Sequence, residues 1–291
     1  MTAIEILGLV IKASLFMVVL GFGMQASLRD VTFLLRRPAQ LIASIVSINV
    51  IMPILGILVA KIFELDHVIE VALVALAAAP IPPILPNKAM KSEGDKSFSF
   101  GLLVTVSFLS LFVIPAVVKI AGWVFEKQTF FAEASIVLTI LTGVVIPMAI
   151  GMLINRFAPG FAERVSGILG KVGFILLIIA CLPILISLFP SIWHLIGNWT
   201  VAVLVVFAIC GIAVGHLLGG SDPHERTVLA LATASRHPGI AIGLTVANLG
   251  DADKSLGIAA VLLYFIVSAI AVIPYLKWMS GRIKQEEGAL A

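Results

Sequence analysis

The chain has 291 residues, of which 60% are hydrophobic and only 12% are charged. Soluble domains average about 25% charged residues, so this composition excludes an ordinary soluble protein and predicts an all-α, polytopic membrane protein. The net charge of +3 comes from dispersed basic residues, which argues against nucleic acid as a partner. Cys181 and Cys210 lie in apolar runs without redox or metal-ligand spacing, so we expect unpaired thiols and neither metal nor cofactor.

Apolar runs of about 20 residues, separated by polar breaks, predict nine membrane spans. In chain order these spans are 4–24, 39–62, 67–90, 97–121, 132–154, 168–189, 199–219, 226–249 and 256–276. The first run has no clear small-residue cleavage site, so we interpret it as a span and not as a signal peptide. The connections are short, which predicts one transmembrane domain over 1–291 with a cytoplasmic tail at 278–291. Residues 30–35 are either a short interfacial helix or a plain turn.

Lysine and arginine residues are distributed unequally between the two sets of connections. One set holds thirteen of them and the opposite set holds three. Because cytoplasmic connections are enriched in basic residues, we expect the C-terminus to be cytoplasmic and the N-terminus to be outside, in the cell's inner (plasma) membrane. Lys12, Lys119 and Arg236 remain at membrane depth.

Two of the predicted spans are interrupted, one in each half of the chain. The third span holds four prolines within residues 80–86, and the eighth holds Pro238-Gly239. Proline removes a helical hydrogen bond and clashes with the preceding turn. Backbone opened at membrane depth is stable only where it is buried in protein or faces a wet cavity, and paired interruptions of this kind point to the binding site of a transporter.

Several segments together carry a resemblance that covers residues 21 to about 249. They are the run GFGMQASLRDV at 21–31, Arg37-Pro38, Met52-Pro53, the stretch from Pro80 to Gly94-Asp95, and ATASRHPG at 232–239. Their spacing resembles the bile acid:sodium symporter family, within the bile/arsenite/riboflavin transporter superfamily. The resemblance implies two inverted repeats of five spans, with two broken helices that cross in a core domain and with a separate panel domain. The chain resembles a version without the first span, so its repeats would hold four spans over about 1–121 and five over about 132–277.

The resemblance implies sodium-coupled transport by alternating access, but the positions of the family's sodium ligands depart from the pattern. Where the family has a glutamate this chain has Ala232, and where the family has a glutamine it has Ile48, with Asn49 beside it. A Ser-Asn pair of the family is replaced by Leu85-Pro86, and a threonine is replaced by Leu103. Only Ser99 keeps a matching hydroxyl. All sixteen carboxylates lie in connections, tails or span ends. Sodium is a hard cation that prefers oxygen ligands, so these positions favour a proton-coupled or facilitative carrier over a sodium symporter with altered ligands.

Arg236 and His237 stand where the family has a Gln-Asn pair, and each has two interpretations. Arg236 either clamps the carboxylate or phosphate of an anionic substrate or caps carbonyls freed by the crossing. His237 either carries a coupled proton or caps the same break as a neutral ring. Lys12, in the middle of the first span, either neutralises substrate charge or faces a wet crevice as a bystander.

Further candidates surround the two interruptions. Asn49, Thr233 and Ser235 are hydrogen-bond donors to the substrate, or else polar residues that pack helices together. Ser99 is the residual candidate for an ion site, and Lys88 either contacts the substrate or is simply solvated. We expect an extended backbone whose carbonyls face a cavity, the alternative being a rigid kink without ligand contact. The residues of this crossing are Pro80, Pro82, Pro83, Pro86, Asn87, Pro238 and Gly239.

These patterns favour a secondary transporter of a small organic anion across a lipid bilayer, coupled to a proton, to sodium or to neither. A non-transporting receptor or sensor that uses the same cavity is the alternative, although no soluble output domain accompanies it. The five histidines are dispersed and no carboxylate pair accompanies them, so we do not expect an enzyme.

Overall fold

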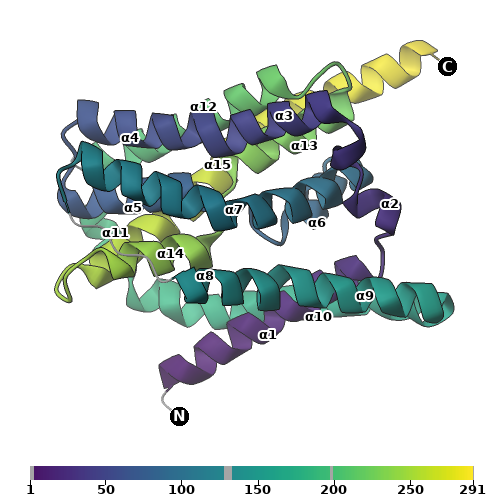
Figure 1. Ribbon diagram of the computed structural model, residues 1–291, viewed down its shortest axis with the longest axis horizontal. Coiled ribbons are helices and arrows are strands. Elements are labelled where there is room, and N and C mark those ends of the chain that lie inside the picture. The colour runs from purple at the N-terminus through teal and green to yellow at the C-terminus, as the bar shows by residue number, and fades with distance from the viewer. Residues whose placement is uncertain (1–2, 128–132, 197–198, 291) are drawn as a thin grey trace.

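The computed structural model describes residues 3–127, 133–196 and 199–290. Within these residues every regular element is helical and none is a strand, which confirms the predicted all-α class (Figure 1). The first half contains α1 (Ala3–Gly23), α2 (Leu28–Val31), the 3₁₀ turn η1 (Leu34–Arg36), α3 (Pro38–Ile45), the π-helical segment η2 (Val46–Ile51), α4 (Met52–Ile62), α5 (His67–Ala78), α6 (Leu85–Met90) and α7 (Lys96–Val124). The second half contains α8 (Glu133–Ile140), the π-helical segment η3 (Leu141–Val145), α9 (Ile146–Phe157), α10 (Pro159–Ser187), α11 (Phe189–Leu195), α12 (Thr200–Leu218), α13 (Pro223–Ala234), α14 (Pro238–Ala247) and α15 (Lys254–Leu290).

Among the described residues, seven continuous helical stretches are long and apolar enough to cross a membrane. They coincide with all the predicted spans except the third and the eighth. Each of those two is a pair of short helices, α5 with α6 and α13 with α14, and non-helical backbone joins the members of each pair. The prolines therefore correctly located both interruptions. Residues 30–35, expected to be a short helix or a turn, are divided between the end of α2 and the turn η1.

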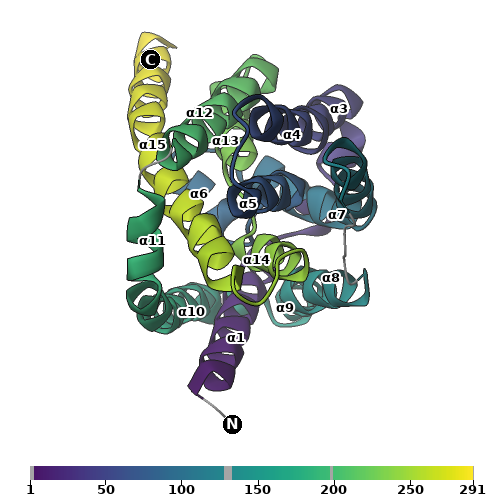
Figure 2. The same cartoon turned by 90° about the vertical axis from the view of Figure 1, so that its left-hand side faces the viewer.

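The helices pack in two groups (Figures 1 and 2). In the first group α1 lies against both α9 and α10, and α8 continues into α9 through η3. In the second group α5 packs against α4, α7, α14 and α15, and α12 packs against α13 and α15. Both broken pairs belong to the second group, which places the two interruptions close to each other in space.

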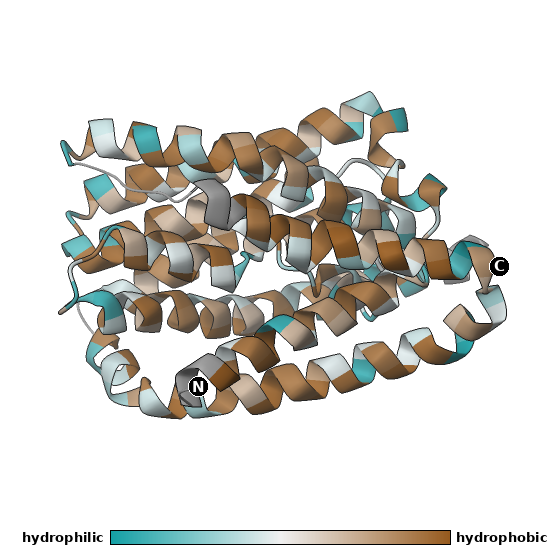
Figure 3. Cartoon of the chain, turned by 60° about the horizontal axis from the view of Figure 1, so that its bottom comes forward, coloured by the Kyte–Doolittle hydropathy of each residue, from teal (hydrophilic) through white to brown (hydrophobic). Residues whose placement is uncertain are grey.

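Polar residues gather near the ends of the helices, and apolar residues cover most of their length (Figure 3). The connections rich in basic residues meet at one end of the molecule. Arg37, before α3, pairs with Glu225 at the start of α13, and Arg29 lines the same cavity as Arg156. The connections rich in lysine and arginine thus lie together at one end of the molecule, which agrees with their predicted placement on one side of the membrane. That the basic end is cytoplasmic stays a prediction.

Glycines on α12 allow this helix to approach the backbone of α13 closely. A Cβ atom at Gly211 would lie 2.9 Å from the Cα of Ala234, and one at Gly215 would lie 2.5 Å from the Cα of Ala230. Small residues at every fourth position let two helices pack backbone to backbone in a membrane, where no hydrophobic effect drives helices together. This contact holds α13, and with it the second interruption, in place.

Gly215→Ala should therefore destabilise the protein, because the new methyl group overlaps backbone atoms of α13 that cannot rotate away. Overpacking of this kind costs about 1–3 kcal/mol. Gly167→Ala on α10 is the matched control, since nothing lies within 4 Å of a Cβ there, and alanine favours a helix over glycine. Thermal unfolding in detergent should show a lower Tm for the first variant and an equal or higher Tm for the second. Equal Tm values for Gly215→Ala and the wild type would contradict the close packing.

Candidate functional site

The first interruption follows α5. Ala79 ends this helix in an extended conformation (φ −67°, ψ 140°), and the non-helical backbone continues to α6. Pro80, Pro82 and Pro83 are buried in this segment, as the prediction of an extended crossing requires. Pro86 lies in the first turn of α6, where a helix tolerates the missing N–H. The side chain of Asn87 lies outside what the structure describes.

The second interruption is shorter and joins α13 to α14. Ser235 ends α13 in an extended conformation, and α14 begins at Pro238 with His237 as its N-cap. The Nδ1 atom of His237 accepts a hydrogen bond from the backbone N–H of Ile240 at 3.3 Å. The buried ring thus satisfies a donor that the start of every helix leaves free. This geometry matches the interpretation of His237 as a capping residue.

The two interruptions hydrogen-bond directly to each other. The backbone N–H of His237 donates to the carbonyl of Pro80 at 2.7 Å. From α15, the hydroxyl of Tyr264 donates to the carbonyl of Ala234 at 2.7 Å. Backbone groups released by breaking the helices are therefore satisfied within the protein, which membrane depth demands. Sequence reasoning did not identify Tyr264, which lies in a mostly apolar span.

Arg236 lies at the centre of this crossing and is only 2% exposed. Its Nη1 atom donates to the carbonyls of Ile48 and Ala79 at 3.4 and 3.3 Å, and its Nη2 atom donates to the carbonyl of Thr233 at 3.0 Å. None of the ion pairs found among the described residues includes this guanidinium. Its Nε is buried and makes no hydrogen bond. Arg236 thus caps freed carbonyls, the second of its two predicted roles, and keeps one donor unused.

Polar side chains from η2 reach the same region. Ser47 and Thr233 share a hydrogen bond of 2.7 Å between their hydroxyls, and Thr233 also donates to the carbonyl of Leu229 at 2.8 Å. The Oδ1 atom of Asn49 is buried without a hydrogen-bond partner. Thr233 is therefore occupied by contacts between helices, whereas Asn49 retains a free acceptor.

A cavity of about 380 Å³ opens beside the crossing. Ser235 and Arg236 line it from the second interruption, and Pro82 and Lys88 line it from the first. The facing wall comes from α10 and α15 and consists mostly of apolar side chains: Phe174, Leu177, Ile178, Cys181, Leu182, Leu185 and Phe265. Lys91, which sequence reasoning left among the cytoplasmic charges, lines the cavity as well. The cavity therefore combines three cationic side chains with an apolar wall.

Other predicted residues lie elsewhere. Lys12 is exposed on α1 and does not line the cavity. Ser99 is buried, and its hydroxyl donates to the carbonyl of Asp95 within the first turn of α7 at 2.6 Å. Pro238 and Gly239 start α14 and do not line the cavity either. The structure thus brings together Arg236, Ser235, Pro82 and Lys88, but leaves Lys12 and Ser99 apart from them.

A larger cavity, of about 690 Å³, lies between α2, α7 and α9. Its wall is mainly apolar, with Arg29 and Arg156 among the residues that line it. None of the residues of either interruption lines it. Volume alone therefore does not identify the site, and the smaller cavity is the one that adjoins the buried arginine.

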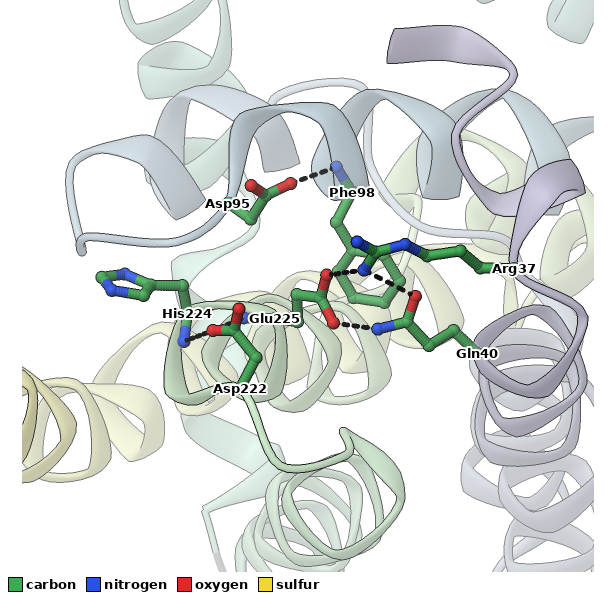
Figure 4. A network of polar contacts seen from close by, with 7 residues as sticks. All are labelled: Arg37, Gln40, Asp95, Phe98, Asp222, His224 and Glu225. Atoms are coloured by element: carbon green, nitrogen blue, oxygen red, sulfur yellow. Dashed lines mark hydrogen bonds and ion pairs between the residues drawn. The ribbon is translucent and has the colours of Figure 1, made fainter. Parts of the chain in front are cut away.

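A second polar cluster occupies the end of the molecule where the basic connections meet (Figure 4). Arg37 donates to one carboxylate oxygen of Glu225 at 2.5 Å, and the side-chain amide of Gln40 donates to the other. The side chain of Glu225 is only 6% exposed, whereas that of Arg37 is 50% exposed. Asp222 caps the same end of α13 by accepting from the N–H of His224 at 2.8 Å. Hydropathy correctly placed Glu225 near a span end, but it could not show that α3 covers this carboxylate.

Because the buried member of this pair is the carboxylate, the two single variants should differ. Arg37→Ala leaves a buried charge without its cation and should lower the Tm by several degrees. Glu225→Gln removes that charge and leaves Arg37 free to turn to water, so its Tm should fall less. Thermal unfolding of both single variants and of the double variant tests this order. A double variant less stable than Arg37→Ala would refute it.

The comparison with known families gives one clear match. The sodium bile acid symporter family matches residues 13–194, which is more than half of the chain. No curated protein matches the chain. The matched stretch includes the first interruption and α10, while the second interruption lies beyond it. Together with the seven helices able to cross a membrane, this match makes the chain a membrane transporter that belongs to the sodium bile acid symporter family, as the resemblance predicted.

Proposed function

We propose that the chain is a secondary transporter that binds a small organic anion in the cavity beside the crossing. The observation that carries this proposal is the composition of the cavity wall, with Arg236, Lys88 and Lys91 opposite the apolar side chains of α10. Ligand sites combine apolar walls with a few placed polar groups that fix orientation. A carboxylate or similar group on an apolar body satisfies both parts of this wall.

The packing of the helices supports alternating access. The cavity separates the crossing from α10, a member of the group formed by α1, α8, α9 and α10. In our proposal this group is the panel domain, and the helices around the crossing are the core domain. The extensive contact between α1 and α10 supports the inverted repeats, because these two helices would be equivalent members of the two halves. Movement of the core against the panel would expose the cavity to each side of the membrane in turn.

We further propose that transport does not use sodium. The expected ligand positions carry Ala232, Ile48 and Leu103, and Ser99 donates its hydroxyl to its own helix. Glu225, the most deeply buried carboxylate among the described residues, is paired with Arg37 at the end of α13 and not at the crossing. A proton is the remaining candidate for coupling, and its carrier would be His237. Protonation of Nδ1 would break the cap of α14 and thereby link the proton to the shape of the crossing.

Uptake by proteoliposomes should accordingly be the same when sodium is replaced by choline outside the vesicles. The assay compares a radiolabelled bile acid conjugate with a short aliphatic carboxylate, under imposed sodium or proton gradients. Stimulation by an inward proton gradient that disappears in His237→Gln would identify a proton symporter, and equal uptake under every gradient a facilitative carrier. Strong dependence on a sodium gradient would refute the proposal on coupling. Saturable binding without any flux would instead identify a receptor.

Lys88→Gln should weaken transport of the anion without unfolding the protein, since Lys88 lines the cavity and makes no ion pair among those found in the described residues. Loss of one cationic contact to an anion is worth about 1–3 kcal/mol, so KM should rise roughly 5-fold or more. Lys171→Gln is the matched control, because Lys171 is exposed on α10 and does not line the cavity. Initial uptake rates over a range of substrate concentrations measure both. An unchanged KM for Lys88→Gln would show that Lys88 does not contact the substrate.

A further inference from the structure

Two of the three carbonyls that Arg236 contacts, those of Ala79 and Thr233, have lost the donor that a regular helix would give them. The residue four positions after Ala79 is Pro83, which has no N–H. The residue four positions after Thr233 is His237, whose N–H donates to Pro80 instead. The carbonyl of Ile48 lies within the π-helical segment η2: its donor in an α-helical register would be Met52, and only in a π-helical register would it be Pro53, which has no N–H. A proline and the exchanged bond therefore free two carbonyls, and both of them, together with that of Ile48, accept hydrogen bonds from one guanidinium.

The electrostatic field at this point favours a positive charge. Ala79 and Thr233 lie at the C-terminal ends of α5 and α13, and the C-terminal end of a helix carries a partial negative charge. Unwound carbonyls and the C-terminal ends of half-helices are the groups that hold sodium in broken-helix transporters. Oxygen atoms from three separate segments, converging in a buried space, thus constitute a site for a small cation. Here its occupant is the guanidinium of Arg236, held at 3.0–3.4 Å.

We infer that Arg236 is a tethered cation, which permanently fills a monovalent-cation site made by the carbonyls of Ile48, Ala79 and Thr233. Its charge neutralises the helix ends at the crossing, so the fold needs no dissolved ion there. The site itself is latent: once the guanidinium is removed, the same oxygens are available to a small alkali cation. Sodium is the expected ligand, because it prefers several oxygen atoms and fits where no thiol or imidazole is offered.

This inference deepens the proposed function, since it explains why a sodium-independent carrier can keep the crossed-helix scaffold. Its test does not depend on transport. The full chain, purified in detergent, is unfolded by heat in sodium, potassium or choline chloride at equal ionic strength. The Tm of the wild type should be the same in all three salts. Arg236→Ala should have a lower Tm in choline, and sodium should raise that Tm by several degrees.

Matched variants separate this effect from general destabilisation. Lys88→Ala removes a cation from the same cavity but not from the carbonyl site, so sodium should not change its Tm relative to choline. Arg236→Lys keeps a tethered cation and should stay insensitive to sodium, whereas Arg236→Met, similar in length but neutral, should respond as Arg236→Ala does. If the neutral variants fold only in sodium, the inference holds.

Two results would overturn the inference. One is a folded Arg236→Ala or Arg236→Met whose Tm is the same in sodium, potassium and choline. The other is a wild-type protein that sodium already stabilises as strongly as it stabilises the variants. If the neutral variants fail to fold in every salt, the Arg236→Lys variant provides the test. A folded Arg236→Lys supports the requirement for a positive charge at this position, and an unfolded one refutes that requirement. Absence of uptake by the wild type would refute the proposed function and leave the cation site untouched.

Discussion

The hydrogen bond from the N–H of His237 to the carbonyl of Pro80 is the contact on which the rest of the structure depends. A helix broken at membrane depth exposes backbone groups that lipid cannot satisfy. Neither interruption could persist alone, but each supplies what the other lacks. Arg236 then joins a third segment, η2, through the carbonyl of Ile48. The two interruptions and η2 thereby form one buried polar centre around Arg236.

This centre constrains the helices around it. α12 must approach α13 closely enough for its glycines to touch backbone, and α15 must bring Tyr264 to the carbonyl of Ala234. These contacts fix the second group of helices to the crossing. α10 faces the crossing across a cavity, whereas α1, η3 and α9 pack toward it in one buried apolar cluster that joins Phe22, Val144 and Met148 to Ile81 and Leu85. The polar centre thus fixes the helices that hydrogen-bond at the crossing, while apolar packing joins α1 and α9 to them.

The sequence predicted the helical class, the positions of seven spans and both interruptions, because hydropathy and proline act locally. It did not predict the partners of Arg236. Carbonyl acceptors carry no side-chain signature, although Pro83 marks the carbonyl of Ala79 through the donor that it lacks. Lys12 was a candidate because it lies in the middle of a span, but its position along α1 does not show which face of the helix carries it. The burial of Glu225 depends on Gln40 and Arg37, far away in the chain, and no local pattern contains that information.

A tethered cation and a dissolved ion differ in what they contribute to transport. An ion that binds with the substrate and leaves with it adds the free energy of its own gradient. A guanidinium fixed to the chain neutralises the same helix ends but cannot leave, and a group equally present in both conformations shifts no equilibrium between them. In the proposed function, Arg236 would thus supply positive charge to an anion in every state of the carrier while supplying no driving force. Accumulation against a gradient would then require a proton, and His237 is the titratable group whose cap on α14 such a proton would break.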